Sequence, residues 1–208
     1  MTDLAHQLTA THREVGKRPS TDGELIGVLL RRGYDAPIDE LWSALTKRDL
    51  LARWFLPVSG ELRVGGKFQL EGNAGGDILQ CDAPRLLRVT FGAPTSIVEV
   101  RLSARDPRHT VLELEHTVPL VFVQNGAGSL YVGPGWDSAV LTLGMFLRGE
   151  VVADPIAAAS SPERQEFSRQ SVHAWAAVVE ASKTATAEEI AAAAKASLAQ
   201  FAPATVQP

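Results

Sequence analysis

Apolar and polar residues alternate along the middle of the chain, between about residues 58 and 118. Glycine and proline turns divide this stretch into six expected strands, at 59–64, 67–72, 76–82, 86–92, 97–104 and 110–118. The first connections are too short for parallel crossovers, so the pattern predicts an antiparallel meander. A seventh strand is predicted at 24–34, where aliphatic residues dominate.

The phase of this alternation predicts a sheet with one apolar and one charged face. The apolar phase of the last two strands holds Val98, Val100, Leu112, Leu114 and His116. The opposite phase holds Glu99, Arg101, Glu113 and Glu115. We interpret these charged residues as ordinary cross-strand pairs on a solvated surface and reject them as a catalytic carboxylate pair.

Helical spacing of apolar residues appears on both sides of the meander. Two short helices are predicted before it, at 37–45 and at about 47–55, and Thr46 with Asp49 fits a capping box for the second. The segment 135–149 is the strongest helix, and its back is apolar as well. A helix that is apolar nearly all round is usually covered on both sides, so another element should lie on its back.

The tail predicts two more helices, at 161–182 and 186–201. Thr186 and Glu189 form a capping box for the second of them. Trp175 lies on the apolar face of the first, which makes this helix the candidate to cover the back of the long helix.

The chain is thus predicted to have three parts. Residues 1–22 are polar and mixed, and we expect a flexible N-terminal arm there. Residues 23–150 form the main domain, in which 119–134 is a long loop. Residues 151–208 form a helical extension that packs on the domain or serves in self-association.

Composition and charge exclude several classes of function. A net charge of -4 and a pI of about 5.7 leave no basic footprint for nucleic acid. The single cysteine, Cys81, excludes an internal disulfide and a cysteine-rich metal site, and the five histidines are scattered, so we expect no metal and no cofactor. The N-terminus has no apolar signal region, and no apolar run is long enough to cross a bilayer, so we expect a cytoplasmic protein.

Three stretches carry a family resemblance: DAPIDELWSALTKRDLLARWFLP, GGKFQLEGNAGGDILQCDAPRLLRVTF and GWDSAVLTLGMFLRG. They resemble proteins similar to the activator of the heat-shock-protein-90 ATPase, a branch of the START/Bet v 1-like (SRPBCC) superfamily. The resemblance spans roughly residues 24–150. It implies an α+β helix-grip fold, with a seven-stranded antiparallel sheet wrapped around a long C-terminal helix. The two tail helices add to this fold.

In proteins of this kind the sheet and the long helix often enclose a cavity. The phases of the strands then predict the wall residues Trp54, Phe55, Phe68, Leu70, Phe91, Val98, Val100, Leu112, Leu114, His116, Trp136, Val140 and Leu143. Aromatic side chains with a few polar ones are typical of a small-molecule site. The alternative is that the same side chains simply fill the core.

Two residues are candidate polar anchors for a ligand. His116 lies on the apolar phase, where it would orient a ligand, act as a general base, or serve as a core histidine bonded to protein atoms. Arg53 lies at the expected pocket mouth. It would either hold a carboxylate or phosphate of the ligand or remain a solvated helix residue. Asp137 is explained by the dipole of the long helix.

The sequence therefore predicts a protein that binds a small hydrophobic or amphipathic molecule. No HExxH, G-x-S-x-G or phosphate-loop motif is present, so no catalytic residue is assigned. One alternative is an interaction protein resembling a co-chaperone, with a homodimer formed through the C-terminal helices. A second alternative is an enzyme resembling polyketide cyclases. Neither nucleic acid nor a membrane is an expected partner.

Overall fold

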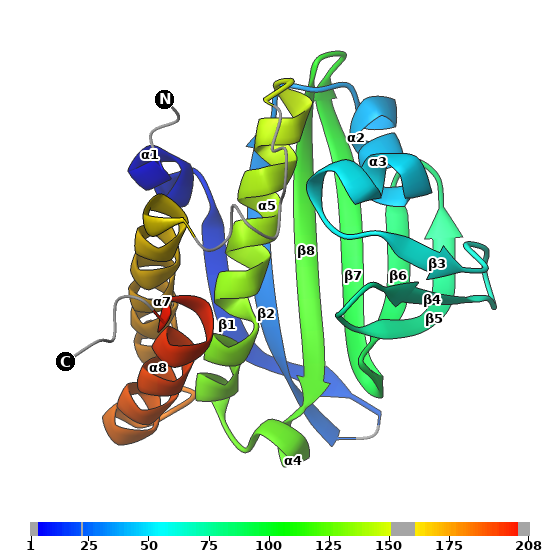
Figure 1. Cartoon of the computed structure of the whole chain (residues 1–208). Helices are drawn as coiled ribbons and strands as arrows, with labels where there is room; N and C mark the ends of the chain where they lie inside the picture. Colours follow the sequence, from blue (N-terminus) through cyan, green and yellow to red (C-terminus); the bar gives the residue numbers. More distant parts are fainter. Residues whose placement is uncertain (1–3, 22, 151–160, 204–208) are drawn as a thin grey trace. The chain divides into compact units, whose positions relative to one another are not determined.

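The computed structural model describes residues 4–21, 23–150 and 161–203. The chain has the α+β helix-grip fold, with an eight-stranded antiparallel sheet in the order β1-β2-β8-β7-β6-β5-β4-β3 (Figure 1). The strands are β1 (His12–Ser20), β2 (Gly23–Tyr34), β3 (Val58–Gly60), β4 (Lys67–Leu70), β5 (Gly75–Asp82), β6 (Leu86–Phe91), β7 (Ala93–Asp106) and β8 (His109–Pro119). The helices are α1 (Leu4–Thr9), α2 (Ile38–Thr46), α3 (Arg48–Trp54), α4 (Leu120–Val123), the 3-10 helix η1 (Gly126–Tyr131), α5 (Gly133–Leu147), α7 (Pro162–Ser182) and α8 (Ala187–Phe201).

The described residues fall into two compact units. The first unit comprises 1–30, 118–141 and 154–208, and the second comprises 31–117 and 142–153. The second unit therefore contains the meander with α2 and α3, while the first contains β1, η1, α7 and α8. Both β2 and α5 have residues in each of the two units.

In the second unit the predicted phase of the meander is confirmed. Val98 pairs with His116 and Val100 pairs with Leu114 across β7 and β8, and all four residues are buried. The other phase pairs Arg101 with Glu113 and Glu99 with Glu115. Glu99 also forms ion pairs with Arg88 and Arg101, whose side chains are about half exposed, so the predicted charged outer face is confirmed too.

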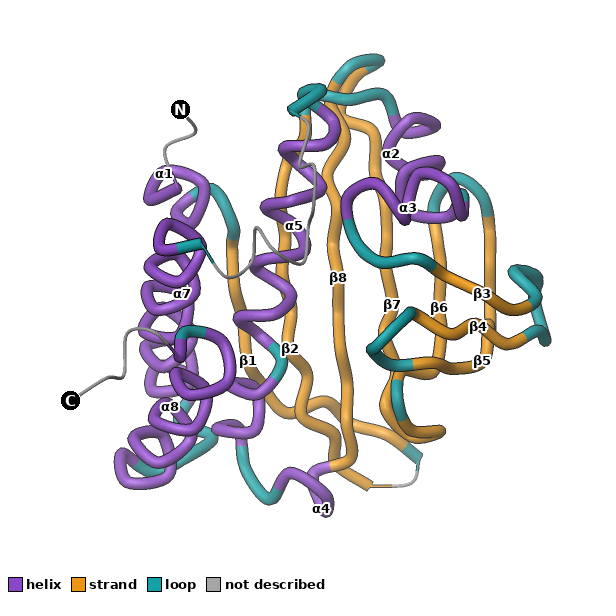
Figure 2. Tube along the Cα trace, viewed as in Figure 1, coloured by secondary structure: helices purple, strands orange, loops and turns teal. Residues whose placement is uncertain are grey.

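The helices α2 and α3 follow each other directly at Lys47 (Figure 2). The predicted capping box at Thr46 is wrong. The Thr46 hydroxyl donates instead to the Trp42 carbonyl at 2.7 Å, and α3 begins without a side-chain cap. Thr46 is the last residue of α2, and a helical Thr hydroxyl readily donates to the carbonyl four residues back. The hydroxyl is then not available to cap α3.

In the first unit the prediction of a flexible arm is corrected. The residues expected to be flexible form α1 and β1. The sheet has eight strands where seven were predicted, and β1 is the additional one. Val15 in β1 is buried, and β1 packs against α7 and η1. The polar sequence of β1 does not predict a strand, because this segment joins the core only through its packing partners.

The long loop predicted at 119–134 is also corrected, since it contains α4 and η1. The Asn125 side chain caps η1 by accepting a hydrogen bond from the Ala127 amide at 2.9 Å. Leu130 of η1 is fully buried, and its carbonyl accepts a bond from Ser197 of α8 at 2.7 Å.

Both predicted tail helices are confirmed. Ser161 caps α7 through the Arg164 amide, and Thr186 with Glu189 forms the complete capping box of α8. The helices α7 and α8 lie side by side (Figure 1). Trp175 of α7 is fully buried against the start of α5, where a Cβ added at Gly133 would lie 2.6 Å from the indole ring.

A buried carboxylate joins three elements of the first unit. Asp137 of α5 is 1% exposed and accepts hydrogen bonds from Arg13 Nε of β1 at 2.9 and 3.0 Å. The Ser171 hydroxyl and the Trp175 indole of α7 donate to the same carboxylate. Burial raises the pKa of Asp137, and the Arg13 charge opposes that rise. The helix-dipole explanation is therefore insufficient, because α5 begins at Gly133 and Asp137 lies beyond its first turn.

Replacing this carboxylate should strongly destabilise the protein. Asp137→Asn leaves the Arg13 guanidinium buried without its counter-charge, and we expect a loss of about 3–5 kcal/mol in the free energy of unfolding. Asp49→Asn is the matched control, because Asp49 is exposed in the first turn of α3 and should change stability by less than about 0.5 kcal/mol. Urea denaturation measures both. Equal effects of the two variants would contradict the central role of Asp137.

Candidate functional site

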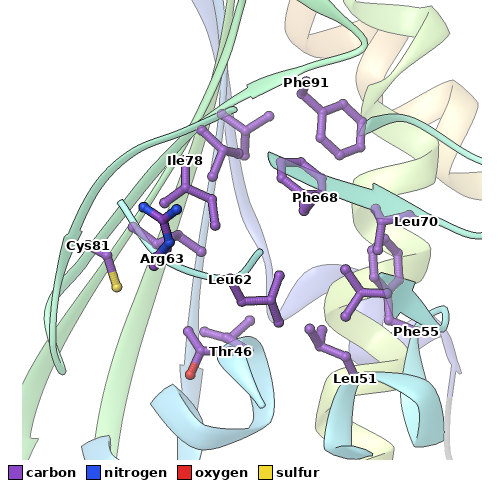
Figure 3. Close-up of a pocket in the computed structure, with 15 residues that line it drawn as sticks. Thr46, Leu51, Phe55, Leu62, Arg63, Phe68, Leu70, Ile78, Cys81 and Phe91 are labelled. Atoms are coloured by element: carbon purple, nitrogen blue, oxygen red, sulfur yellow. The ribbon is translucent and has the colours of Figure 1, made fainter. Parts of the chain in front are cut away.

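An apolar pocket of about 160 Å³ lies in the second unit (Figure 3). Fifteen residues line it: Leu45, Thr46, Leu51, Phe55, Val58, Leu62, Arg63, Phe68, Leu70, Ile78, Cys81, Leu87, Val89, Phe91 and Val98. Twelve of them are aliphatic or aromatic, so the environment excludes polar ligand groups from most of the cavity.

The pocket walls follow from strand periodicity and from two short helices. Residues two apart on a strand share a face, which places Phe68 with Leu70 on β4 and brings Leu87, Val89 and Phe91 together on β6. The end of α2 and one side of α3 supply the opposite wall. Figure 3 shows the rings of Phe55, Phe68 and Phe91 gathered on one side of the cavity.

A glycine on β5 allows the strands of this wall to approach closely. Gly76 pairs with Phe68 of β4, and a Cβ added at Gly76 would lie 1.9 Å from the Thr90 carbonyl oxygen of β6. No larger residue fits there without moving the backbone. The small residue therefore permits Phe68 and Phe91 to line the same cavity.

The rim of the pocket is the connection between β3 and β4, residues 61–66, which we call the rim loop. Leu62 is 38% exposed and points toward the middle of the cavity (Figure 3). The loop is held on β5, because the Gly65 amide donates to the Ile78 carbonyl and the Ile78 amide donates to the Gly66 carbonyl, each at 2.9 Å. Leu62 is therefore positioned by backbone bonds.

Three polar side chains complete the lining. The Thr46 hydroxyl donates to Trp42, and Arg63 pairs with Glu61 at 2.6 Å on the surface. Partial burial and the charge of Asp82 raise the pKa of the Cys81 thiol. Cys81 is therefore mostly a protonated thiol at neutral pH and reacts slowly there.

Five of the predicted wall residues line this pocket: Phe55, Phe68, Leu70, Phe91 and Val98. Others of the second unit are buried without lining it: Trp54, Val100, Leu112, Leu114, His116 and Leu143. Trp54 donates to the Ala44 carbonyl at 2.9 Å and stacks on Phe55, so it supports a wall residue. Trp136 and Val140 belong to the first unit.

Sequence reasoning missed the rim and part of the strand wall. Leu87 and Val89 share the phase of Phe91, so this phase was a sufficient signal for them. The rim residues Leu62 and Arg63 were expected within a strand, whereas they lie in a loop that other strands fix in place.

His116 lies next to the pocket lining. Its Nε2 is 2.8 Å from the Ser96 hydroxyl oxygen, and its ring meets the edge of Phe91 with centroids 6.0 Å apart. Burial lowers the pKa of His116 to about 4, so the imidazole is neutral at neutral pH. Arg53 is exposed on α3, with its guanidinium 5.1 Å from the centre of the Phe146 ring. Neither residue lines the pocket.

The described residues contain no cluster of three or more His, Cys, Asp or Glu side chains that would hold a metal ion. Over the same residues, no helix combines the length and apolar composition needed to cross a membrane.

The buried His116 should make the protein sensitive to acid. The unfolded state, with a histidine pKa near 6.5, binds this proton more readily than the folded state, whose pKa is about 4. Stability therefore falls as the pH drops from about 6.5 toward 4, and the difference of the two pKa values corresponds to about 3 kcal/mol. Denaturation curves between pH 7 and 4 measure this loss.

His116→Gln should flatten that pH dependence, because glutamine does not titrate. The exposed His173→Gln is the control and should keep the slope of the parent protein. If His116→Gln retains the full slope, other groups cause the acid sensitivity.

Comparison with known proteins gives the family. Residues 35–143 match the model of the Activator of Hsp90 ATPase homolog 1-like protein family. A search of curated proteins gives no match.

Several solved structures resemble this one. The crystal structure of CalU16 from Micromonospora echinospora has 42% sequence identity and a TM-score of 0.68, over 82% of this chain and 98% of CalU16. DynU16, a protein from the dynemicin biosynthetic locus, has 21% identity and a TM-score of 0.51, over 60% of this chain and 48% of DynU16. PFC0360w, an HSP90 activator from Plasmodium falciparum, has 23% identity and a TM-score of 0.51, over 59% of this chain and 96% of that protein. The last two show the shared fold alone.

The family model covers the pocket-bearing strands and both short helices, and CalU16 matches over nearly its whole length. The chain belongs to the Activator of Hsp90 ATPase homolog 1-like family.

Proposed function

We propose that this protein binds a small hydrophobic or amphipathic molecule, with the apolar part of that molecule in the pocket beneath the rim loop. The observation that carries this proposal is the cavity of about 160 Å³ with an almost wholly apolar lining. An apolar lining favours an apolar guest, because water against these side chains finds few hydrogen-bond partners.

The size of the cavity limits the guest. A protein cavity of about 150 Å³ holds one benzene molecule, whereas pockets for drug-sized ligands measure about 300–1,000 Å³. The pocket therefore suits a single aromatic ring or a short aliphatic chain. The remainder of a larger ligand would lie along the rim loop, where Leu62 is partly exposed.

No catalytic role is proposed for His116. Its imidazole lies 2.8 Å from the Ser96 hydroxyl oxygen, and His116 is 4% exposed and does not line the cavity. A general base must come within hydrogen-bond reach of its substrate, which the buried His116 does not offer to a guest in this cavity.

Filling the cavity from the rim should weaken binding strongly. Leu62→Trp places an indole in the space of the guest, and we expect its affinity for 3-phenylpropan-1-ol to fall at least about tenfold. Val64→Trp is the matched control, because Val64 belongs to the same rim loop, is 53% exposed and does not line the pocket. It should bind within about twofold of the parent protein.

Calorimetry measures the affinity, and Cys81 provides a second readout. It is the only cysteine of the chain and lines the pocket, so a bound guest should slow its reaction with a thiol reagent at mildly alkaline pH. If the parent protein does not bind the probe, or if both tryptophan variants bind equally well, the pocket is not a ligand site.

A second candidate function is the binding of a partner protein through the first unit. Val121 and Phe122 of α4 are 78% and 68% exposed, and Tyr131 of η1 is 48% exposed. Exposed large apolar side chains close together in sequence are typical of interaction sites. Phe122→Ser should then abolish any concentration-dependent increase in mass seen by light scattering. An association that persists unchanged in this variant would exclude α4 as its interface.

A further inference from the structure

The pocket lining carries one positive charge and no negative charge. Of the fifteen lining residues only Arg63 is ionised at neutral pH, since Thr46 and Cys81 are neutral and the rest are apolar. Arg63 lies on the rim loop beside Leu62, so its guanidinium is at the edge of the cavity (Figure 3). An apolar cavity with a cation at its edge matches a ligand with an apolar end and an anionic end.

The backbone holds Arg63 at this edge. Its amide donates to the Glu61 carbonyl at 2.8 Å, and its carbonyl accepts from the Gly66 amide at 2.9 Å. Gly66 is required for this compact turn, because a Cβ there would lie 2.2 Å from the Glu61 carbonyl oxygen. The backbone of Arg63 is therefore set before any ligand arrives, and only its side chain has to be ordered on binding.

The present partner of Arg63 is one that a ligand can replace. Arg63 Nη2 donates to Glu61 Oε2 at 2.6 Å, and the two side chains are 71% and 67% exposed. Exposed ion pairs of this kind add little stability. A guanidinium has five N–H donors in a planar fork, and a carboxylate fits that fork with two parallel bonds.

The neighbouring charges indicate where the anionic group lies. Arg48 of α3 donates to the Gly60 carbonyl at 2.7 Å, next to the rim loop, which adds a second cation on this side. Asp82 lies next to Cys81 and accepts a bond from Gln80. The anionic end is therefore favoured at Arg63 and disfavoured at Cys81.

We propose that the ligand of this pocket is a carboxylate amphiphile, a molecule with one ring or short chain in the cavity and a carboxylate on Arg63. This inference rests on the proposed binding function. The ligand carboxylate takes the place of Glu61 on the guanidinium, and no covalent step is involved.

Three probes that share the ring and the tether test the proposal: 3-phenylpropanoate, 3-phenylpropanamide and 3-phenylpropylammonium. Calorimetry on the full chain should show the carboxylate binding about tenfold more tightly than the neutral amide, because its hydrogen bonds are charge-assisted. The ammonium compound should bind most weakly. The advantage of the carboxylate should shrink as salt is raised from 0.05 to about 0.5 M, since the group is exposed.

Three variants assign the effect to Arg63. Arg63→Gln should bring the affinities of the carboxylate and the amide to within about twofold of each other, mainly by weakening the carboxylate. Arg85→Gln is the control, because Arg85 is exposed in the β5–β6 turn and does not line the pocket. Glu61→Gln should tighten carboxylate binding, since it removes the competing acid.

The outcomes separate this inference from the proposed function. If carboxylate and amide bind the parent protein equally well, or if Arg63→Gln keeps the full preference, the carboxylate assignment is wrong while the pocket still binds ligands. If none of the three probes binds, the proposed function fails together with the inference.

Discussion

The register of the β6–β7–β8 ladder is the constraint on which the second unit depends. Side chains alternate between the two faces of a strand, so a slip of one residue would exchange the buried and the exposed set. In the observed register Val98 faces His116 across the ladder while Arg101 faces Glu113. A slip would bury the charged residues and expose the apolar ones, which makes other registers costly. The pocket wall at Phe91 and Val98 exists because this register is fixed.

The first unit depends on a different interaction, the buried carboxylate of Asp137. Its partners Arg13, Ser171 and Trp175 come from a strand and a helix that are far apart in sequence. Each donor satisfies part of a charge that burial would otherwise disfavour, and the group is stable only while all of these elements are in place. The N-terminal strand, the start of α5 and the tail helix α7 are therefore expected to unfold together.

No single feature of the pocket identifies the class of its ligand, but the features together restrict it. Its apolar lining and small volume match one ring or a short chain, and the rim loop supplies one charge through Arg63. A single charge at the edge of an apolar cavity orients a ligand without the cost of burying an ion. Likeness to CalU16 and to the family model establishes the fold and the family, while the carboxylate proposal follows from Arg63 and its neighbours in this chain.

The sequence by itself determined the features that depend on near neighbours. The strand phase at Leu112 and Leu114 and the capping box at Thr186 and Glu189 were predicted because they need only residues a few positions apart. The cap at Thr46 failed, since its hydroxyl had a competing local acceptor in α2. Tertiary structure alone decided that the polar segment 12–20 is a strand, that Asp137 bonds Arg13, and that Leu62 and Arg63 form a pocket rim. These features depend on contacts between residues distant in the chain, and periodicity carries no information about such contacts.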